Sequence, residues 1–189
     1  MKKMTVFLVF STLCIAFLAI QACSKKNDAM AAAPMPTLYD SLGGTTLVAD
    51  PKQQGTQIEK GRLLIRTIVD STIFVIAADS KINGFFKVLL AEVTSGNTSG
   101  FTALSKNLTD FVCVGTGAKN FSYGGKSMVA AHDPAQNPRM NGKAGNADMD
   151  QFETDLFMGA NKAGVPSNTP ALVSVGKIVE SLRGAVVQK

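Results

Sequence analysis

One stretch in the first half of the chain limits the possible folds more than any other. Between Gly55 and Ser80, side chains suited to a core recur at spacings of three, four and seven residues: Ile58, Ile65, Ile68, Thr72 and Ile76. Such spacings place them on one face of a helix. The β-branched residues would also suit strands, but the stretch from Arg62 to Ala78 contains no glycine or proline for a hairpin turn. The stretch therefore predicts one long helix.

The last third of the chain predicts a helical hairpin. The first of its helices has Asn146 or Asp148 as its N-terminal cap, Gly164 as its stop, and one apolar face made by Met149, Phe152 and Leu156. The second follows the turn "VPS", begins with polar residues and Pro170, and has one apolar stripe: Leu172, Val175, Val179, Leu182 and Val186. A short connection of this kind joins antiparallel neighbours.

The segments between these regions favour further helices. "SKINGFFKVLLAEV" (80–93) predicts a shorter helix or a pair of turns, and "TSGNTSG" (94–100) predicts a loop. "FTALSKNLTDFVCV" (101–114) predicts a second core-facing helix that ends at "GTG". No repeat of fixed period is visible. The predicted fold class is all-α, with one domain over 37–189.

The composition fits a globular chain with an apolar leader, because 46% of residues are hydrophobic, 17% are charged, and the mean hydropathy is mildly positive. Without Lys2 and Lys3 of the leader, 17 basic residues face 14 acidic ones, a balance of +3. These charges are scattered and form no basic stripe interleaved with aromatics. The pattern argues against nucleic acid as a partner.

The N-terminus, "MKKMTVFLVFSTLCIAFLAIQAC", has a charged start, an apolar run and a small residue before Cys23, the layout of a secretory signal. "IQAC" resembles a bacterial lipobox, which implies a signal peptide over 1–22 and lipid on the thiol of Cys23. Ser24 then favours an outer-membrane lipoprotein that faces the periplasm or the exterior, and "AMAAAPMP" completes a tether over 23–36. The alternative is an uncleaved membrane anchor over 5–22.

The cysteines leave no disulfide to hold the fold. Cys14 lies in the predicted leader, Cys23 carries the predicted lipid, and Cys113 stands alone in the apolar context "DFVCVG". Cys113 is therefore predicted to be a small buried side chain of the core.

A single histidine, His132, lies near the end of "YGGKSMVAAHD", just before Pro134. Any Ser-His-Asp or Cys-His-Asn catalytic group would need this residue, and no G-x-S-x-G elbow is present. Zinc sites need several nitrogen or sulfur ligands, and the glycines of 115–125 match neither the Walker nor the dinucleotide spacing. Haem asks the protein for one axial ligand only, because the porphyrin supplies its own nitrogens.

Several pieces of the sequence, in their order and approximate spacing, resemble a truncated haemoglobin of the first group. They are "TLYDSLGG" at 37–44, "ADSKINGFF" at 78–86, "YGGKSMVAAH" at 123–132, and "DMDQF" at 148–152 followed by "AGVPS". The resemblance spans Thr37 to the C-terminus. It implies the two-over-two helical sandwich of that family, and haem b with its iron as the cofactor.

The resemblance also assigns roles to residues. His132 becomes the proximal ligand of the haem iron, and its other ring nitrogen is expected to donate to a backbone carbonyl or to water. The other matched positions are haem contacts: Phe86 on the haem face, Phe111, Met128 and Phe152 in the apolar pocket, Tyr123 and Lys106 near the propionate edge, and Ala103 and Asn107 on the distal helix face.

The chain departs from the family pattern on the distal side and in three insertions. Where the family usually has a distal tyrosine, Ile73 stands next to Phe74, and neither side chain can donate a hydrogen bond. Asn107 is then the best remaining distal donor. Extra residues occur beside His132 and in two other places: 134–145, 45–60 and 94–100.

Two functions from different classes follow. The first is a membrane-tethered haem globin that binds oxygen or nitric oxide, or passes electrons. The resemblance allows turnover of nitric oxide with bound oxygen, in which case a reductase is a further partner. The second is a globin-shaped lipoprotein without haem that serves as an envelope binding or scaffolding module.

Overall fold

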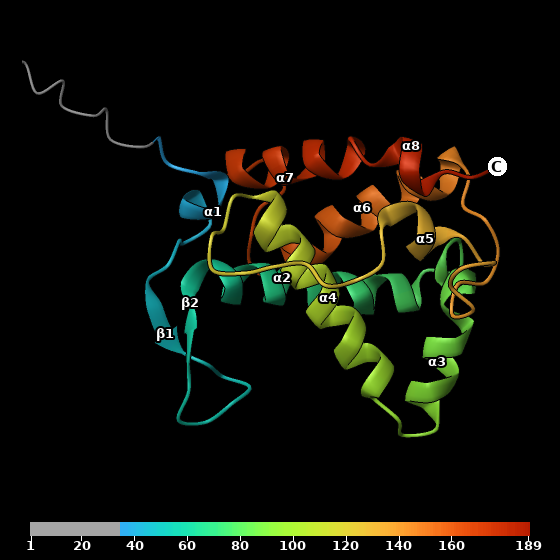
Figure 1. The fold of residues 1–189 in the computed structure, drawn as a ribbon, viewed down its shortest axis with the longest axis horizontal. Coiled ribbons are helices and arrows are strands. Elements are labelled where there is room, and N and C mark those ends of the chain that lie inside the picture. The colour runs from blue at the N-terminus through green and yellow to red at the C-terminus, as the bar shows by residue number, and fades with distance from the viewer. Residues whose placement is uncertain (1–34) are drawn as a thin grey trace, which may run out of the picture. The chain divides into compact units, whose positions relative to one another are not determined.

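Helix α2 (Lys60–Ala78) lies at the centre of the protein in the computed structural model, which describes residues 35–189 (Figure 1). Helices α4 (Ser99–Gly115) and α6 (Asn146–Lys162) both pack against it. Its buried face contains residues whose spacing predicted a helix: Ile65, Ile68, Thr72 and Ile76. The core therefore lies between α2, α4, α6 and α7 (Pro170–Glu180).

The crossing of α2 and α6 depends on Gly159. A Cβ placed there would lie 2.6 Å from the Cα of Thr72, so a larger residue would push the two helices apart. The hydroxyl of Thr72 donates to the backbone oxygen of Ile68 at 2.8 Å, which satisfies this buried group within its own helix. Close approach of the two backbones thus fixes α6 on α2.

The N-terminal part of the predicted long helix is instead a strand. The prediction spans 55–80, but α2 begins at Lys60, and β2 (Gln57–Glu59) pairs antiparallel with β1 (Leu47–Ala49). The turn residues Pro51 and Gly55 lie between β1 and β2 and let the chain fold back, and Gly55 has a φ of +80°. Ile58 is buried as expected, but it is buried from a strand.

The elements after α2 agree with the sequence prediction. The 3₁₀ helix η1 (Asn83–Phe86) and helix α3 (Lys87–Thr94) confirm the short helix or pair of turns predicted over 80–93. Helix α4 confirms the second core-facing helix and begins at Ser99, inside the predicted loop 94–100. It buries Cys113 completely, and burial raises the pKa of this thiol to about 11, so the thiol is a core side chain and not a reactive one.

Two short helices have side-chain caps at their N-termini. Helix α1 (Leu38–Ser41) begins after Thr37, whose side chain forms a capping box with Asp40. Helix α5 (Met128–His132) is the short turn of helix that carries His132, and Ser127 caps it by accepting from the backbone N–H of Ala130 at 3.2 Å.

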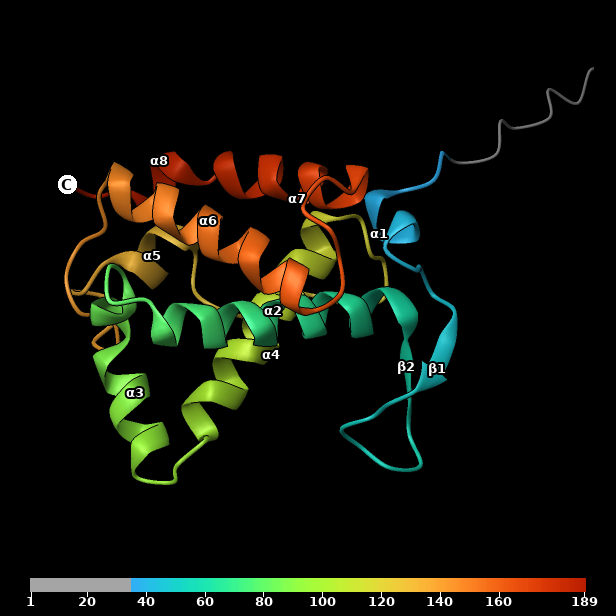
Figure 2. The ribbon, with the colours of Figure 1, turned by 180° about the vertical axis from the view of Figure 1, so that it is seen from behind.

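The predicted helical hairpin is present as α6 and α7, which lie side by side (Figure 2). The N-cap of α6 is Gly145 and not Asn146, because the carboxylate of Asp148 accepts from the Gly145 N–H at 2.8 Å. Gly164, with a φ of +83°, ends this region as predicted.

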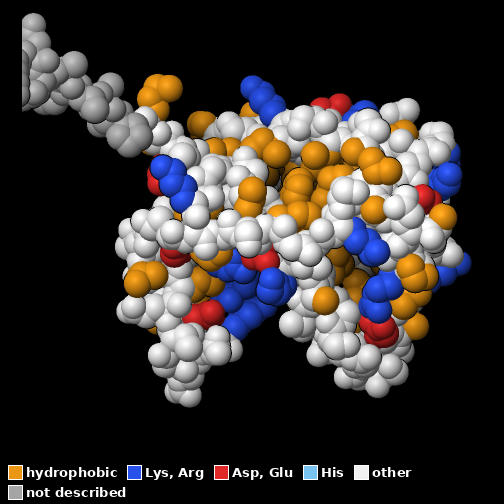
Figure 3. All heavy atoms as spheres, viewed as in Figure 1, with side chains coloured by type: hydrophobic (Ala, Val, Ile, Leu, Met, Phe, Trp, Pro, Cys, Tyr) orange, Lys and Arg blue, Asp and Glu red, His pale blue; other side chains and the backbone are white. Residues whose placement is uncertain are grey.

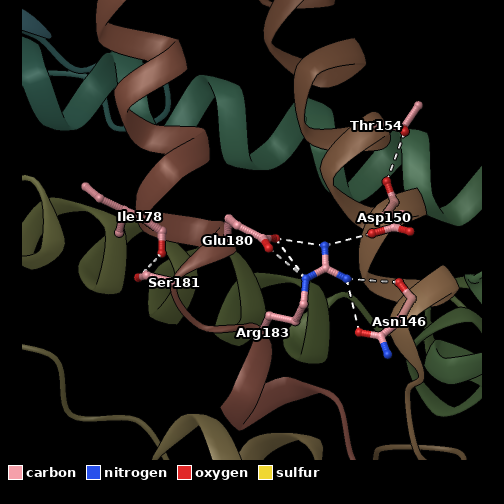
Figure 4. Close-up of polar contacts among 7 residues, drawn as sticks. All are labelled: Asn146, Asp150, Thr154, Ile178, Glu180, Ser181 and Arg183. Atoms are coloured by element: carbon pink, nitrogen blue, oxygen red, sulfur yellow. Dashed lines mark hydrogen bonds and ion pairs between the residues drawn. The ribbon is translucent and has the colours of Figure 1, made fainter.

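The apolar stripe predicted from Leu172 to Val186 is divided between α7 and α8 (Arg183–Val186). The chain turns at Ser181 and Leu182, and Arg183 holds the turn. Its guanidinium pairs with Glu180 at 2.8 Å and with Asp150 of α6 at 2.7 Å (Figure 4). The stripe is still mostly buried, with Leu182 only half-buried.

The predicted signal peptide (1–22), the lipid site Cys23 and nearly all of the predicted tether (23–36) lie outside the described residues. Within 35–189, no helix combines the length and the apolar character needed to cross a bilayer.

Candidate functional site

The ring of His132 is held through Nδ1, an orientation that leaves Nε2 available to bind a metal. His132 is the last residue of α5 and is half-buried, and its Nδ1 lies 2.8 Å from the backbone oxygen of Met128. Because a carbonyl oxygen can only accept, Nδ1 carries the proton and donates it. In the neutral ring Nε2 then keeps its lone pair, and the hydrogen bond fixes the ring orientation, as in protein metal sites that use histidine.

The other ligands of such a metal would have to come from a cofactor. In the part of the chain that the structure describes, no group of three or more His, Cys, Asp or Glu side chains could hold an ion. A porphyrin meets this condition, because it brings four nitrogens and needs one protein ligand. His132 as a single protein ligand therefore fits haem.

Two of the predicted site residues, Tyr123 and Phe111, lie against each other. Their rings meet edge to face with centroids 5.3 Å apart. The Tyr123 hydroxyl donates to the backbone oxygen of Lys126 at 2.6 Å, and burial raises the pKa of this phenol. The contact brings the segment that leads into α5 onto the surface of α4.

The predicted haem contacts on α4 lie on different sides of this helix. At about 100° per residue, Phe111 lies within about 60° of the half-buried Leu104 and Leu108. Lys106 points to the opposite side of the helix, whereas Asn107 lies next to Phe111 in phase and is exposed, as is Ala103. Leu104 and Leu108 are apolar residues of this arc that the sequence comparison did not single out, although their i, i+4 and i+7 spacing with Phe111 was visible.

Lys106 belongs to an ion-pair cluster. Its Nζ lies 2.6 Å from the carboxylate of Asp110, and Arg62 of α2 binds the same carboxylate at 2.7 Å. Burial by itself would raise the pKa of Asp110, but hydrogen bonds from Lys106 and Arg62 outweigh it and lower this pKa below its ordinary value. The cluster joins α4 to α2.

The remaining predicted contacts are half-buried, in two different environments. Phe152 of α6 packs against the buried core cluster. Phe86 at the end of η1 and Met128 at the start of α5 are half-buried without packing against that cluster, as is Phe111. Phe86, Phe111 and Met128 therefore keep part of their apolar surface exposed to solvent.

The positions predicted to be distal, Ile73 and Phe74, offer no hydrogen-bond donor from α2. Ile73 is buried, and Phe74 is 64% exposed with its ring 5.3 Å from that of Phe101 on α4. On the face drawn in Figure 3, hydrophobic side chains gather in a hollow in the middle of the molecule, between α7 and the segment 116–127. The floor of this hollow is therefore apolar.

Comparisons with known proteins support the fold prediction. No protein-family model matches the chain, and no curated protein matches its sequence. Among solved structures, two variants of the truncated hemoglobin from Tetrahymena pyriformis, both in the Fe(III) form, are similar to this chain. Each is 21% identical and has a TM-score of 0.56, and each match covers 82% of this chain and 100% of the other. The protein therefore has a truncated-globin helical fold, which confirms the predicted fold class.

Proposed function

We propose that this protein is a haem-binding globin in which His132 is the protein's ligand to the iron, and that it binds a diatomic gas or passes electrons. The observation that carries the proposal is the hydrogen bond from His132 Nδ1 to the Met128 oxygen, which leaves Nε2 free to bind a metal. The likeness of the fold to truncated hemoglobins supports haem as the cofactor.

The chain's own residues would hold and shield the cofactor. Phe86, Phe111, Met128 and Phe152 supply apolar surface, worth roughly 25 cal/mol for each Å² removed from water. Tyr123 is proposed for the propionate edge. Lys106, which points away from Phe111, would have to turn and leave or share its ion pair with Asp110 to reach the same edge. Bound haem supplies the gas-binding and redox chemistry.

The distal side points to weak stabilisation of bound oxygen. Ile73, Leu104 and Leu108 cannot donate a hydrogen bond. Asn107 is the candidate donor, because it is exposed and adjoins Phe111 in helical phase. If Asn107 has this role, Asn107→Leu will speed the release of oxygen from the ferrous protein in stopped-flow measurements, and an unchanged rate will remove it from the role.

We further propose that the protein belongs to the first group of truncated haemoglobins and is a cell-envelope lipoprotein anchored through Cys23. The sequence "IQAC" followed by Ser24 supports the lipid site. Labelling of cells with a radioactive fatty acid should mark the wild-type chain and leave Cys23→Ala unlabelled. Equal labelling of the two would overturn this part of the proposal. A reductase partner and turnover of nitric oxide depend on the same haem and are tested after it.

The first test is a titration of the full chain in detergent with haemin. The wild type should give a sharp Soret band at one haemin per chain, and His132→Ala should lose it and regain part of it with added imidazole. Met158→Leu is the matched control, because Met158 is an exposed residue of α6 with an iron-binding side-chain type. If wild type and His132→Ala give the same broad spectrum, the haem proposal is wrong and the haem-free module takes its place.

A further inference from the structure

Residues 133–145, called the strap below, connect His132 to α6 and include the whole insertion 134–145. At the histidine end, the strap folds back on α5. The side chain of Asn137 donates to the backbone oxygen of Ala131 at 2.7 Å, and its backbone N–H donates to the oxygen of Asp133 at 2.8 Å. The residue before His132 is therefore tied to the strap as well as to its own helix.

The middle of the strap binds η1, the element that ends in Phe86. The backbone N–H of Asn141 donates to the oxygen of Phe85 at 3.0 Å, and its side chain donates to the oxygen of Gly84 at 2.9 Å. Both ribbon views draw this segment passing the ends of α3 and η1 on its way to α6 (Figures 1 and 2). The strap thus joins the histidine helix to the segment that carries two aromatic rings.

An ion pair closes this connection onto α3. Arg139 of the strap binds Glu92 in bidentate fashion, with Nη1 2.8 Å from Oε1 and the second contact between Nη2 and Oε2. A Cβ at Gly100, near the start of α4, would overlap both the guanidinium and the carboxylate. Glycine at this position therefore lets the pair lie against α4.

The far end of the strap returns to α5 through the C-terminus. Ala144 forms a bridge with Val187, and the backbone N–H of Gln188 donates to the Ala144 oxygen at 2.9 Å. The side chain of Gln188 donates to the backbone oxygen of Val129 in α5 at 3.0 Å. Helix α5 is thus held on one side by Asn137 and on the other by Gln188.

We propose that the strap positions His132 against η1 and α3, and that the Arg139–Glu92 pair is the latch that sets how long haem stays bound. Arg139, Asn137 and Asn141 are positioning residues in this account, because they act through α5 and η1. The retention part rests on the proposed function. The positioning part concerns the protein alone and holds without the cofactor.

The test compares the full chain with Arg139→Gln, Glu92→Gln and the double variant. Hydrogen exchange of the α5 amides in the haem-free protein reports positioning, and the rate of haem transfer to excess apomyoglobin reports retention. Each single variant should raise the exchange rate of the α5 amides and the rate of haem transfer several-fold. The double variant should raise these rates no further than either single variant does, since the two residues form one interaction. Gly100→Ala, which removes no charge, should act in the same direction by pushing the pair apart.

Arg66→Gln is the matched control, because Arg66 makes a bidentate pair with Asp50 in a different insertion. It should leave α5 exchange and haem transfer at wild-type values. Unchanged rates in Arg139→Gln and Glu92→Gln, or equal changes in Arg66→Gln, would overturn the proposal. Failure of the proposed function has another signature: no Soret band in any of these proteins, while α5 exchange is still faster in the latch variants.

Discussion

Two insertions in this protein use the same chemistry for different ends. The hairpin over 45–59 and the strap over 133–145 are each clamped by a bidentate arginine–carboxylate pair. The ion pairs of the hairpin reach α2, through Arg66 with Asp50 and Lys52 with Asp70. Its last residue, Glu59, also accepts hydrogen bonds from Tyr39 of α1 at 2.7 Å and from Asn120 at 2.6 Å. The strap binds α5, η1, α3 and the C-terminus. What an ion pair does is therefore decided by the elements it joins, and the Arg139–Glu92 pair fastens a segment that also binds α5 and η1.

The two clamps also differ in exposure. The side chains of Arg66 and Asp50 are 16% and 9% exposed, whereas those of Arg139 and Glu92 are 47% and 22% exposed. Exposed pairs are weakened by salt and contribute about 0–1 kcal/mol to stability. The strap latch should therefore open more readily than the hairpin clamp.

The largest effect, on the free energy of unfolding, is expected at the crossing of α2 and α6. Gly159→Val should force α2 and α6 apart and lower the free energy of unfolding by about 1–3 kcal/mol or more, because a core crossing would be overpacked. Chemical denaturation measures this. Hydrogen exchange should rise in the hairpin and in the strap alike. Gly184→Ala, where a Cβ meets nothing within 4 Å, is the control and should change stability little.

The next largest effect, on haem transfer, should distinguish the strap from the hairpin. Replacing 134–143 by a short glycine linker should speed haem transfer about tenfold, equivalent to about 1.4 kcal/mol, because α5 loses its ties to η1 and α3. Shortening the hairpin between Leu47 and Ile58 should lower thermal stability, since Ile58 is buried, and leave haem transfer unchanged. Equal effects of the two deletions on haem transfer would contradict the claim that the strap affects haem retention and the hairpin does not.

Acid should open the strap before the hairpin. The hydrogen bond from Arg66 lowers the pKa of Asp50 to about 2, and that from Arg139 lowers the pKa of Glu92 below its ordinary value of 4.5. A carboxyl with a depressed pKa stabilises the fold above its unfolded pKa, and this stabilisation is lost as pH falls through the folded pKa. Hydrogen exchange measured from pH 6 downward, corrected for intrinsic rates, should therefore rise in the strap at a higher pH than in the hairpin.

The smallest effect concerns Asp155, which belongs to neither insertion. Its Oδ2 is buried without a hydrogen-bond partner, and burial together with the nearby Asp79 raises the pKa of Asp155. The folded state then binds more protons than the unfolded state, so stability falls as pH rises above the ordinary aspartate pKa. Asp155→Asn should gain on the order of 1 kcal/mol at neutral pH and flatten this dependence in urea titrations. The order in which strap and hairpin open in acid should stay as in the wild type.

Local patterns were enough to predict most helices. The spacing of Ile65, Ile68, Thr72 and Ile76 predicted α2 because burial of one helix face repeats every three to four residues. Gly164 predicted the end of the α6 region because a positive φ there favours glycine. The hairpin was missed because Ile58 fits a helical face and a buried strand equally well, and pairing with Val48 decides between them.

The site was predictable where chemistry is local and not where contacts are distant. A histidine that bonds a carbonyl four residues earlier is a property of one short helix, and His132 with Met128 follows it. The strap contacts join residues far apart in the sequence, such as Arg139 and Glu92, and no spacing rule connects them. The phase of α4, which sets Leu104 and Leu108 beside Phe111, required knowing where that helix is buried.

The central claim is that the chain's single histidine is the protein ligand of haem iron, and one measurement tests it most directly. Because His132 is the only histidine, growth with ¹⁵N-labelled histidine labels this side chain alone. Resonance Raman spectra of the ferrous haem complex should contain an iron–histidine stretching band that moves to lower frequency with the label and is absent in His132→Ala. A spectrum in which haem is bound and no band responds to the label would contradict the account.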